Sequence, residues 1–180
     1  MKTSKTPHSI TGRKLWAAAA VAALSMGAAA PATAQTIGGH IGFVLPLVTE
    51  GGGQTTTLAD GFSMGFPFGI TLKGKGPFAL DFEFIPQIQD SPRNVSFTVH
   101  PGALWSIGHG FAVGLRAAFV VNSPEFGFTP LLHKSWPIQG EHNFFKAYFA
   151  EADLPVRFDR PPGGLASNPV TFAMHFGLEF

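Results

Sequence analysis

Strict alternation of side-chain character is the feature that most constrains this chain. Between residues 62 and 72, large apolar side chains occupy every second position, and glycine, serine, threonine or proline stands between them. The same alternation returns over residues 170–180. Because successive side chains of a β-strand point to opposite faces, each segment is predicted to be a strand with one bulky apolar face and one small or polar face.

Eight segments of this kind follow one another, and each approximates the roughly 9–11 residues that a tilted strand needs to cross a bilayer. The predicted strands span residues 37–48, 60–72, 77–88, 95–105, 111–121, 126–136, 144–158 and 169–180. Six prolines fall inside them, and each lacks the amide donor of a strand ladder, so we interpret these positions as bulges or strand ends. They are Pro46, Pro67, Pro86, Pro101, Pro130 and Pro155.

The composition is typical of strands that lie in a membrane. Charged residues make up only 13% of the chain, 19 residues are phenylalanine, and the mean hydropathy is +0.20. After residue 34, no uninterrupted apolar run approaches the roughly 18 residues of a membrane-spanning helix. Only helices and closed barrels satisfy their own backbone hydrogen bonds in lipid. We therefore predict an all-β fold, an eight-stranded antiparallel up-and-down transmembrane β-barrel, rather than a soluble barrel with a charged outer face.

The first 34 residues have the pattern of an export signal. Four basic residues precede an apolar, alanine-rich stretch, and Ala32, Thr33 and Ala34 provide the small residues of a cleavage site. We expect residues 1–34 to be a cleaved signal peptide and residues 35–180 to be a single domain. Cleavage would remove four of the 12 basic residues, which leaves eight against 11 acidic residues, a net charge of −3. This charge argues against a nucleic-acid partner, and the absence of cysteine excludes a lipoprotein anchor.

The last predicted strand resembles the C-terminal strand of bacterial outer-membrane proteins. This resemblance implies that Phe176, Leu178 and the aromatic Phe180 form the signal read by the barrel assembly machinery. In size and strand count the chain resembles the eight-stranded group typified by the transmembrane domain of outer membrane protein A. The resemblance implies an integral protein of the Gram-negative outer membrane, in contact with its lipids and lipopolysaccharide and assisted by periplasmic chaperones. We expect a monomer without a cofactor.

The inward face is predicted to hold a lumen network of charged residues and histidines. Opposite charges in this low-dielectric interior are expected to pair, because unpaired charges are costly there. We therefore interpret the network as a salt-bridge plug that fills the barrel, whose interior is just wide enough for side chains. The lumen network comprises His40, Asp81, Glu83, Arg116, Glu151, Asp153, Arg157, His175 and Glu179, and His100 and His133 share its face.

The charges of the lumen network do not balance. Five carboxylates face two arginines, a formal charge of −3. A narrow proton or cation path could use this surplus, as could a metal held by His40, His175 and nearby carboxylates. The residue spacing matches no established ligand motif, so we assign no metal site from the sequence.

Five outward residues near one end of their strands are predicted to be membrane-interface anchors. Aromatic girdles are typical of these barrels, and lysine can extend its ammonium group along apolar surface to reach the interface. An even number of strands places this end, with both termini and the short turns, on the periplasmic side. The anchors are Trp105, Lys134, Trp136, Lys146 and Tyr148.

One short motif is similar to that of an enzyme family. His133-Lys134-Ser135 resembles the His-x-Ser of the lipid A deacylases, which are also eight-stranded outer-membrane barrels. The resemblance implies that His133 would activate Ser135 as a nucleophile. Here the pair has inward parity, Trp136 replaces the asparagine of that family, and Glu141 and Glu151 are expected to be poorly placed to orient the imidazole. We interpret the motif as a coincidence.

We therefore expect a non-enzymatic barrel with a structural or slow-permeation role in the envelope. Two alternatives stay open, a lipid A-modifying hydrolase and a narrow porin-like channel for ions or small solutes. The sequence identifies no catalytic residues.

Overall fold

The computed structural model describes residues 36–90, 92–140, 143–158 and 168–180 of the 180-residue chain. All of them belong to one unit, Ala34–Phe180. The expected signal peptide at residues 1–34 lies outside this described part. Among the described residues, no helix is long and apolar enough to cross a membrane.

Eleven strands form one antiparallel sheet in the described part of the chain. They are β1 (Thr36–Gly51), β2 (Gln54–Thr57), β3 (Ser63–Gly65), β4 (Phe68–Lys73), β5 (Phe78–Gln89), β6 (Asn94–Gly108), β7 (Phe111–Val120), β8 (Phe126–Pro137), β9 (Ala147–Asp153), β10 (Val156–Phe158) and β11 (Val170–Glu179).

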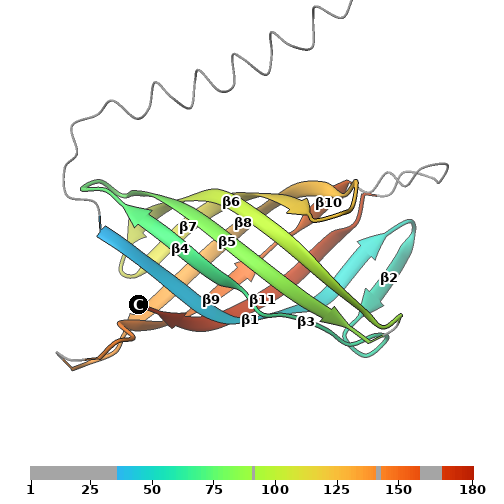
Figure 1. Ribbon diagram of the computed structural model, residues 1–180, viewed down its shortest axis with the longest axis horizontal. Helices are drawn as coiled ribbons and strands as arrows, with labels where there is room; N and C mark the ends of the chain where they lie inside the picture. Colours follow the sequence, from blue (N-terminus) through green and yellow to red (C-terminus); the bar gives the residue numbers. More distant parts are fainter. Residues whose placement is uncertain (1–35, 91, 141–142, 159–167) are drawn as a thin grey trace, which may run out of the picture. The chain divides into compact units, whose positions relative to one another are not determined.

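The sheet closes on itself as a barrel with eight strand positions (Figure 1). β3 and β4 share the second position between β1 and β5, while β9 and β10 share the seventh, between β8 and β11. β2 pairs with the end of β1. β11 closes the ring by pairing with β1 from His40↔Glu179 to Glu50↔Val170. The predicted eight-stranded up-and-down barrel is therefore confirmed, although the seventh strand begins at Ala147 rather than at residue 144.

Three of the six prolines lie between two strands or at a shift of strand register. Pro67 lies between β3 and β4, and Pro155 lies between β9 and β10. The register of β1 against β11 shifts between Pro46 and Val48. These three positions agree with the interpretation of prolines as bulges or strand ends.

That interpretation is wrong for Pro86, Pro101 and Pro130, which lie inside continuous strands. The carbonyl oxygen of Pro86 accepts a hydrogen bond from the N–H of Phe66 (2.8 Å), and that of Pro130 accepts one from Leu154 (2.9 Å). In an antiparallel ladder the N–H and C=O of one residue face the same neighbour. The side of Pro86 that lacks an N–H group therefore faces the gap between β3 and β4, and that of Pro130 faces the gap between β9 and β10. Few strand-to-strand hydrogen bonds are lost at these gaps.

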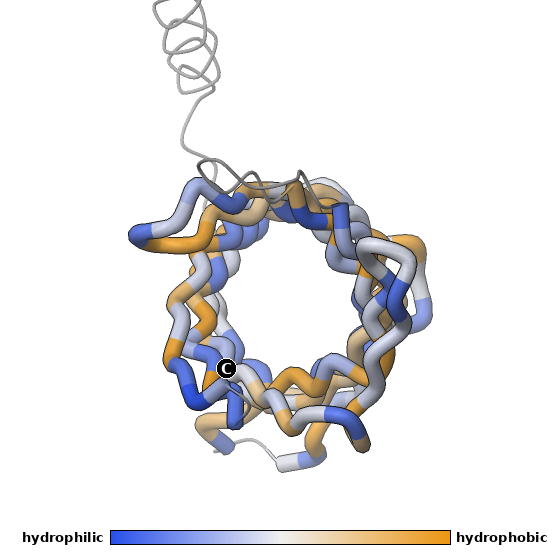
Figure 2. Tube along the Cα trace, turned by 90° about the vertical axis from the view of Figure 1, so that its right-hand side faces the viewer, coloured by the Kyte–Doolittle hydropathy of each residue, from blue (hydrophilic) through white to orange (hydrophobic). Residues whose placement is uncertain are grey.

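The outer face of the barrel is apolar, and the inner face carries the charges. Figure 2 shows the backbone ring end-on, with hydrophilic and hydrophobic positions mixed around it. A closed barrel that exposes a band of large apolar side chains and buries charged ones is built to span a membrane. Exposed members of this band include Phe43, Phe68, Ile70, Phe82, Leu115, Phe119, Leu132 and Phe172.

The two ends of the barrel differ in their connections. Thr36 and Phe180 lie at the same end as the turns after β4 and β6, and we call this the terminal end (Figure 1). The turns after β1, β5 and β7 lie at the opposite end, the loop end. The turn after β6 uses three consecutive left-handed residues, Gly108, His109 and Gly110, with φ of 96°, 53° and 76°. Glycine supplies two of these because it adopts positive φ without steric cost.

Candidate functional site

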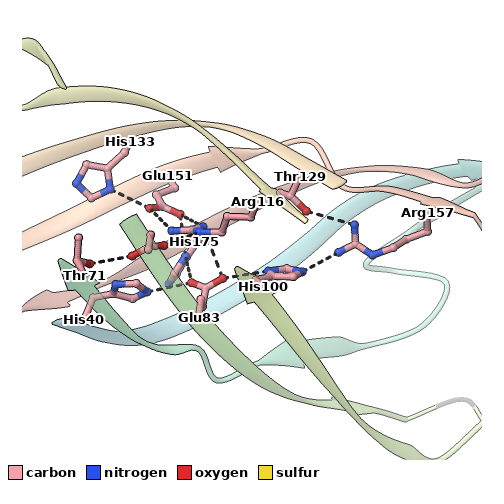
Figure 3. A network of polar contacts seen from close by, with 11 residues as sticks. His40, Thr71, Glu83, His100, Arg116, Thr129, His133, Glu151, Arg157 and His175 are labelled. Carbon is pink, nitrogen blue, oxygen red and sulfur yellow. Dashed lines mark hydrogen bonds and ion pairs between the residues drawn. The ribbon is translucent and has the colours of Figure 1, made fainter. Parts of the chain in front are cut away.

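Arg116 on β7 is the centre of the lumen network (Figure 3). Its Nε donates to Asp81 Oδ2 at 2.8 Å. Its two terminal nitrogens donate to Glu151 Oε2 and Oε1 at 2.9 and 3.2 Å. Glu83 Oε2 lies 3.6 Å from Arg116 Nη1. All four side chains are buried, so the guanidinium offsets carboxylates that have no access to bulk water.

A glycine lets the Arg116 side chain reach across a strand. In the barrel register Gly102 lies between Asp81 on β5 and Arg116 on β7. A Cβ atom at Gly102 would come within 2.6 Å of Arg116 Cγ. The absence of a side chain at this inward position is therefore what allows Arg116 to pass over β6 to Asp81.

Glu83 on β5 is a second centre of the lumen network. Its Oε1 lies 3.0 Å from His40 Nε2, and its Oε2 lies 3.1 Å from His100 Nδ1. Gly69 separates His40 from Glu83 in the register, and the His40 ring fills the space that a Cβ at Gly69 would need. His175 Nδ1 joins the two centres, because it lies 3.1 Å from Glu151 Oε2 and 3.6 Å from Glu83 Oε1.

Arg157 is placed differently from the expected salt-bridge plug. Its Nη2 lies 3.2 Å from His100 Nε2, and its Nη1 donates to Thr129 Oγ1 at 3.2 Å. Its Nε lies 3.8 Å from Glu125 Oε1, in a salt bridge outside the lumen network. Arg157 thus joins the lumen network through His100, and the expected pairing of Arg157 with an inward carboxylate of the network is wrong. It lies toward the loop end, beyond the reach of Glu151 and Asp81.

His133 lies between two carboxylates. Its Nδ1 is 2.9 Å from Glu151 Oε1, and its Nε2 is 2.9 Å from Glu179 Oε1. The expectation that Glu151 is poorly placed to orient His133 is therefore wrong, because the register pairs the two residues directly on β8 and β9. Glu141 lies outside the described residues. With both ring nitrogens facing carboxylates, His133 has no nitrogen directed at Ser135.

Two cavities open toward the two ends of the barrel. The loop-end cavity has a volume of about 420 Å³ and is lined by Glu83, His100, Arg116, Asp153 and His175 at its inner end. The terminal-end cavity has a volume of about 240 Å³ and is lined in part by His133, Ser135 and Glu179. The two cavities share no lining residue. The salt bridges of Arg116 lie between them.

Asp60 is an acidic residue near the mouth of the loop-end cavity, in the connection between β2 and β3. The hydroxyl of Thr57 donates to Asp60 Oδ2 at 2.8 Å and its backbone N–H donates to the same oxygen at 2.7 Å. These two hydrogen bonds lower the pKa of Asp60, because they stabilise the ionised carboxylate. Asp60 therefore carries a negative charge at neutral pH.

Two buried polar atoms of the lumen network have no hydrogen-bond partner among the described residues. They are Asp153 Oδ1 and His175 Nε2. Two sets of three residues could also hold a metal ion, each with one ligand atom per residue and all three atoms within 4.8 Å of one another. One set is His40, Glu83 and His175, and the other is Glu151, Asp153 and His175.

The five predicted anchors gather at the terminal end. Trp136 and Tyr148 stack with ring centroids 5.5 Å apart.

Lys134 Nζ lies 4.4 Å from the Phe111 ring centroid and donates to the carbonyl oxygen of His109. Lys146 Nζ donates to the carbonyl oxygen of Asn143 at 2.6 Å. Both ammonium groups therefore donate hydrogen bonds to backbone carbonyl oxygens that lie beyond the ends of the strands. This is the placement expected of lysines that extend toward a membrane interface. Trp105 is exposed on β6.

The three residues of the expected assembly signal lie on the seam between β11 and β1. Phe176 pairs with Phe43, and their ring centroids are 5.7 Å apart. Leu178 pairs with Ile41. The N–H of Phe180 donates to Gly39 O at 2.9 Å, and Phe180 O accepts from the N–H of Gly39 at 3.0 Å. In the structure these residues close the barrel.

Sequence reasoning missed several polar members of the interior. Thr71 Oγ1 donates to Asp81 Oδ1 at 2.8 Å, and Thr129 accepts from Arg157. Both threonines stand at inward positions of their strands, and this parity is the sequence signal that could have placed them in the lumen. The roles of Gly69 and Gly102 depend on which residues lie opposite them, and no single strand reveals that.

No protein-family model matches the sequence, and no curated protein matches it. Among solved structures, the chain is similar to Ail, the attachment invasion locus protein of Yersinia pestis, in complex with the heparin analogue sucrose octasulfate. The superposition has a TM-score of 0.42 and a sequence identity of 9%, and it covers 81% of this chain and 98% of that chain. A similarity of this size carries no argument about function, and the fold assignment rests on the strand pairing described above.

Proposed function

We propose that this protein is an integral β-barrel of the bacterial outer membrane with a non-enzymatic, structural role in the envelope. The observation that carries the proposal is the salt-bridged Arg116 cluster between the two cavities. The exposed apolar band and the aromatic anchors support insertion among outer-membrane lipids and lipopolysaccharide. Assembly by the barrel assembly machinery, with periplasmic chaperones, belongs to the same proposal.

A closed lumen distinguishes a structural barrel from a channel. Arg116, Asp81 and Glu151 hold one another by hydrogen bonds of 2.8 to 3.2 Å. An ion that passed through the barrel would have to separate these buried charges, and breaking such a pair is strongly unfavourable. The structural role is therefore favoured over slow permeation.

The hydrolase alternative has less support. A serine nucleophile needs an imidazole nitrogen beside its hydroxyl and an acid on the other nitrogen. His133 has carboxylates on both nitrogens, Glu151 on one side and Glu179 on the other. We expect the purified protein to leave lipid A unchanged. A lipid A hydrolase activity that disappears in Ser135→Ala would overturn this expectation.

Planar-bilayer recording tests the closed lumen. We expect the purified native protein to give no conductance above that of protein-free membranes, with a known porin recorded in parallel to show that insertion is detectable. Steady conductance from the native protein that changes in Glu151→Gln would contradict the structural role, because it would place the ion path through the lumen network.

A further inference from the structure

We infer that the inner end of the loop-end cavity binds a divalent transition-metal ion, through Glu151, Asp153 and His175. The inference starts from Asp153, a buried carboxylate whose Oδ1 has no hydrogen-bond partner among the described residues. A buried carboxylate without a partner is costly, and a bound cation is one way to offset its charge.

The two arginines of the lumen network, Arg116 and Arg157, donate their hydrogen bonds to groups other than Asp153. Arg116 donates its hydrogen bonds to Asp81 and Glu151. Arg157 donates to Thr129 and to backbone carbonyl oxygens, and it is hydrogen-bonded to His100. Neither arginine therefore supplies a hydrogen bond to Asp153.

The neighbours of Asp153 supply the other ligand types. Asp153 and Glu151 are two residues apart on β9 and share its inward face, and β11 places His175 directly opposite Glu151. One ligand atom from each residue lies within 4.8 Å of the other two. Ligands at about 2.0–2.2 Å from a tetrahedral zinc ion stand roughly 3.4 Å apart, so the three ligand atoms would move together by up to about 1.4 Å to bind the ion. His175 Nε2 is a second buried polar atom without a hydrogen-bond partner among the described residues.

The ligand atoms of Glu151, Asp153 and His175, two carboxylates and one imidazole, indicate the class of ion. Imidazole nitrogen favours transition metals such as Zn²⁺ over Mg²⁺, and two carboxylates would neutralise a divalent charge. Asp153 and His175 both line the loop-end cavity, which gives the ion a way in. Asp60 also lines this cavity and adds a negative charge to its wall, which attracts cations.

The set His40, Glu83 and His175 is the competing location. Glu83 already has both oxygens hydrogen-bonded, to His40 and His100. Glu151 of the assigned set is likewise hydrogen-bonded at both oxygens, with Arg116, His133 and His175. Only the assigned set, however, contains a buried carboxylate oxygen without a hydrogen-bond partner among the described residues, Asp153 Oδ1. We assign the ion to the Asp153 set for this reason.

Zn²⁺ titration of the folded protein in detergent, measured by calorimetry, tests the inference. We expect one saturable Zn²⁺ site, and an affinity at least about tenfold weaker in Asp153→Asn. Because Asp153 Oδ1 has no hydrogen-bond partner among the described residues, the asparagine variant is expected to fold, which circular dichroism checks. Asp60→Asn is the matched control: it removes the same charge from the same cavity and is expected to leave the affinity unchanged. Mg²⁺ is expected to bind much more weakly than Zn²⁺.

Three results would overturn the assignment. The first is the absence of saturable Zn²⁺ binding to the native protein. The second is an equal loss of affinity in Asp153→Asn and Asp60→Asn, which would indicate general attraction to an acidic cavity. The third is a loss in His40→Gln with full binding in Asp153→Asn, which would place the ion beside Glu83. The native structural role of the barrel does not depend on any of these outcomes.

Discussion

Gly102 and Gly69 stand at two of the points where a side chain of the lumen network crosses a strand. A Cβ at Gly102 would meet Arg116 Cγ at 2.6 Å and the backbone oxygen of Leu115 at 2.7 Å. The first atom belongs to a side chain that is fixed by its salt bridges, and the second belongs to a neighbouring strand. Neither can move without disturbing the buried charges, so the identity of these residues matters as much as that of the charged ones.

Gly102→Ala is therefore expected to destabilise the barrel by about 1–3 kcal/mol, the usual cost of overpacking a filled interior. The free energy of unfolding can be measured by urea titration in lipid vesicles. Gly74→Ala is the control, because nothing lies within 4 Å of a Cβ at that position in the turn after β4. Equal effects of the two substitutions would show that Gly102 does not make room for Arg116.

Arg116→Met is expected to cost about 3–5 kcal/mol, because it leaves Asp81 and Glu151 buried without their cation. The same urea titration measures this loss. Arg157→Met should cost clearly less, since Arg157 is only partly buried and its salt bridge to Glu125 is longer, at 3.8 Å. A loss for Arg157→Met as large as that for Arg116→Met would contradict the central role of Arg116.

At the scale of strands, the outer face and the inner face of each strand meet different surroundings. Leu115 and Arg116 are neighbours on β7, yet Leu115 is 54% exposed on the outer face while Arg116 is 1% exposed. Alternation alone produces this contrast. Because Arg116 lies between the two cavities, Leu115 lies near the middle of the barrel's length, where a lipid environment would be most apolar.

Leu115→Arg should consequently destabilise the barrel in lipid vesicles by about 2–4 kcal/mol, the cost of arginine at the midplane of a bilayer. Val95→Arg is the control, since Val95 is exposed near the start of β6 at the loop end and should cost much less. Unfolding in vesicles measures both variants. A soluble barrel would tolerate both substitutions equally, so equal and small losses would refute the membrane-spanning interpretation.

At the scale of the whole molecule, closure between β1 and β11 turns a sheet into a barrel. Leu45 and Met174 are register partners across this seam. The chain contains no cysteine, so a disulfide introduced here would report on closure without competing thiols. Residues directly opposite each other in an antiparallel pair have Cα atoms about 4.5–5.5 Å apart, within the range of about 4.4–6.8 Å that a disulfide spans.

The double variant Leu45→Cys with Met174→Cys is expected to oxidise to an intramolecular disulfide in the folded state, detected by a mobility shift on a non-reducing gel. Leu45→Cys with Leu132→Cys is the control, because Leu132 lies on β8, which does not pair with β1. Failure of the first pair to oxidise, or oxidation of both pairs to the same extent, would contradict the closed barrel.

The sequence by itself determined the fold class and the side of each strand on which a residue lies. The strand period is two, so the parity of Asp81, Arg116 or His175 can be read from local neighbours alone. This is why the inward face of the lumen network and the outward face of the apolar band were predictable without any pairing information.

Only the tertiary structure decided which inward residues meet. The contacts of Arg116 with Asp81 and Glu151 cross intervening strands, and they depend on register and on a glycine at the crossing point. The same dependence placed Glu151 against His133 and left Asp153 without a partner. Parity is a local property of the chain, whereas register is set by how distant strands align, and the candidate metal site therefore appears only in the folded barrel.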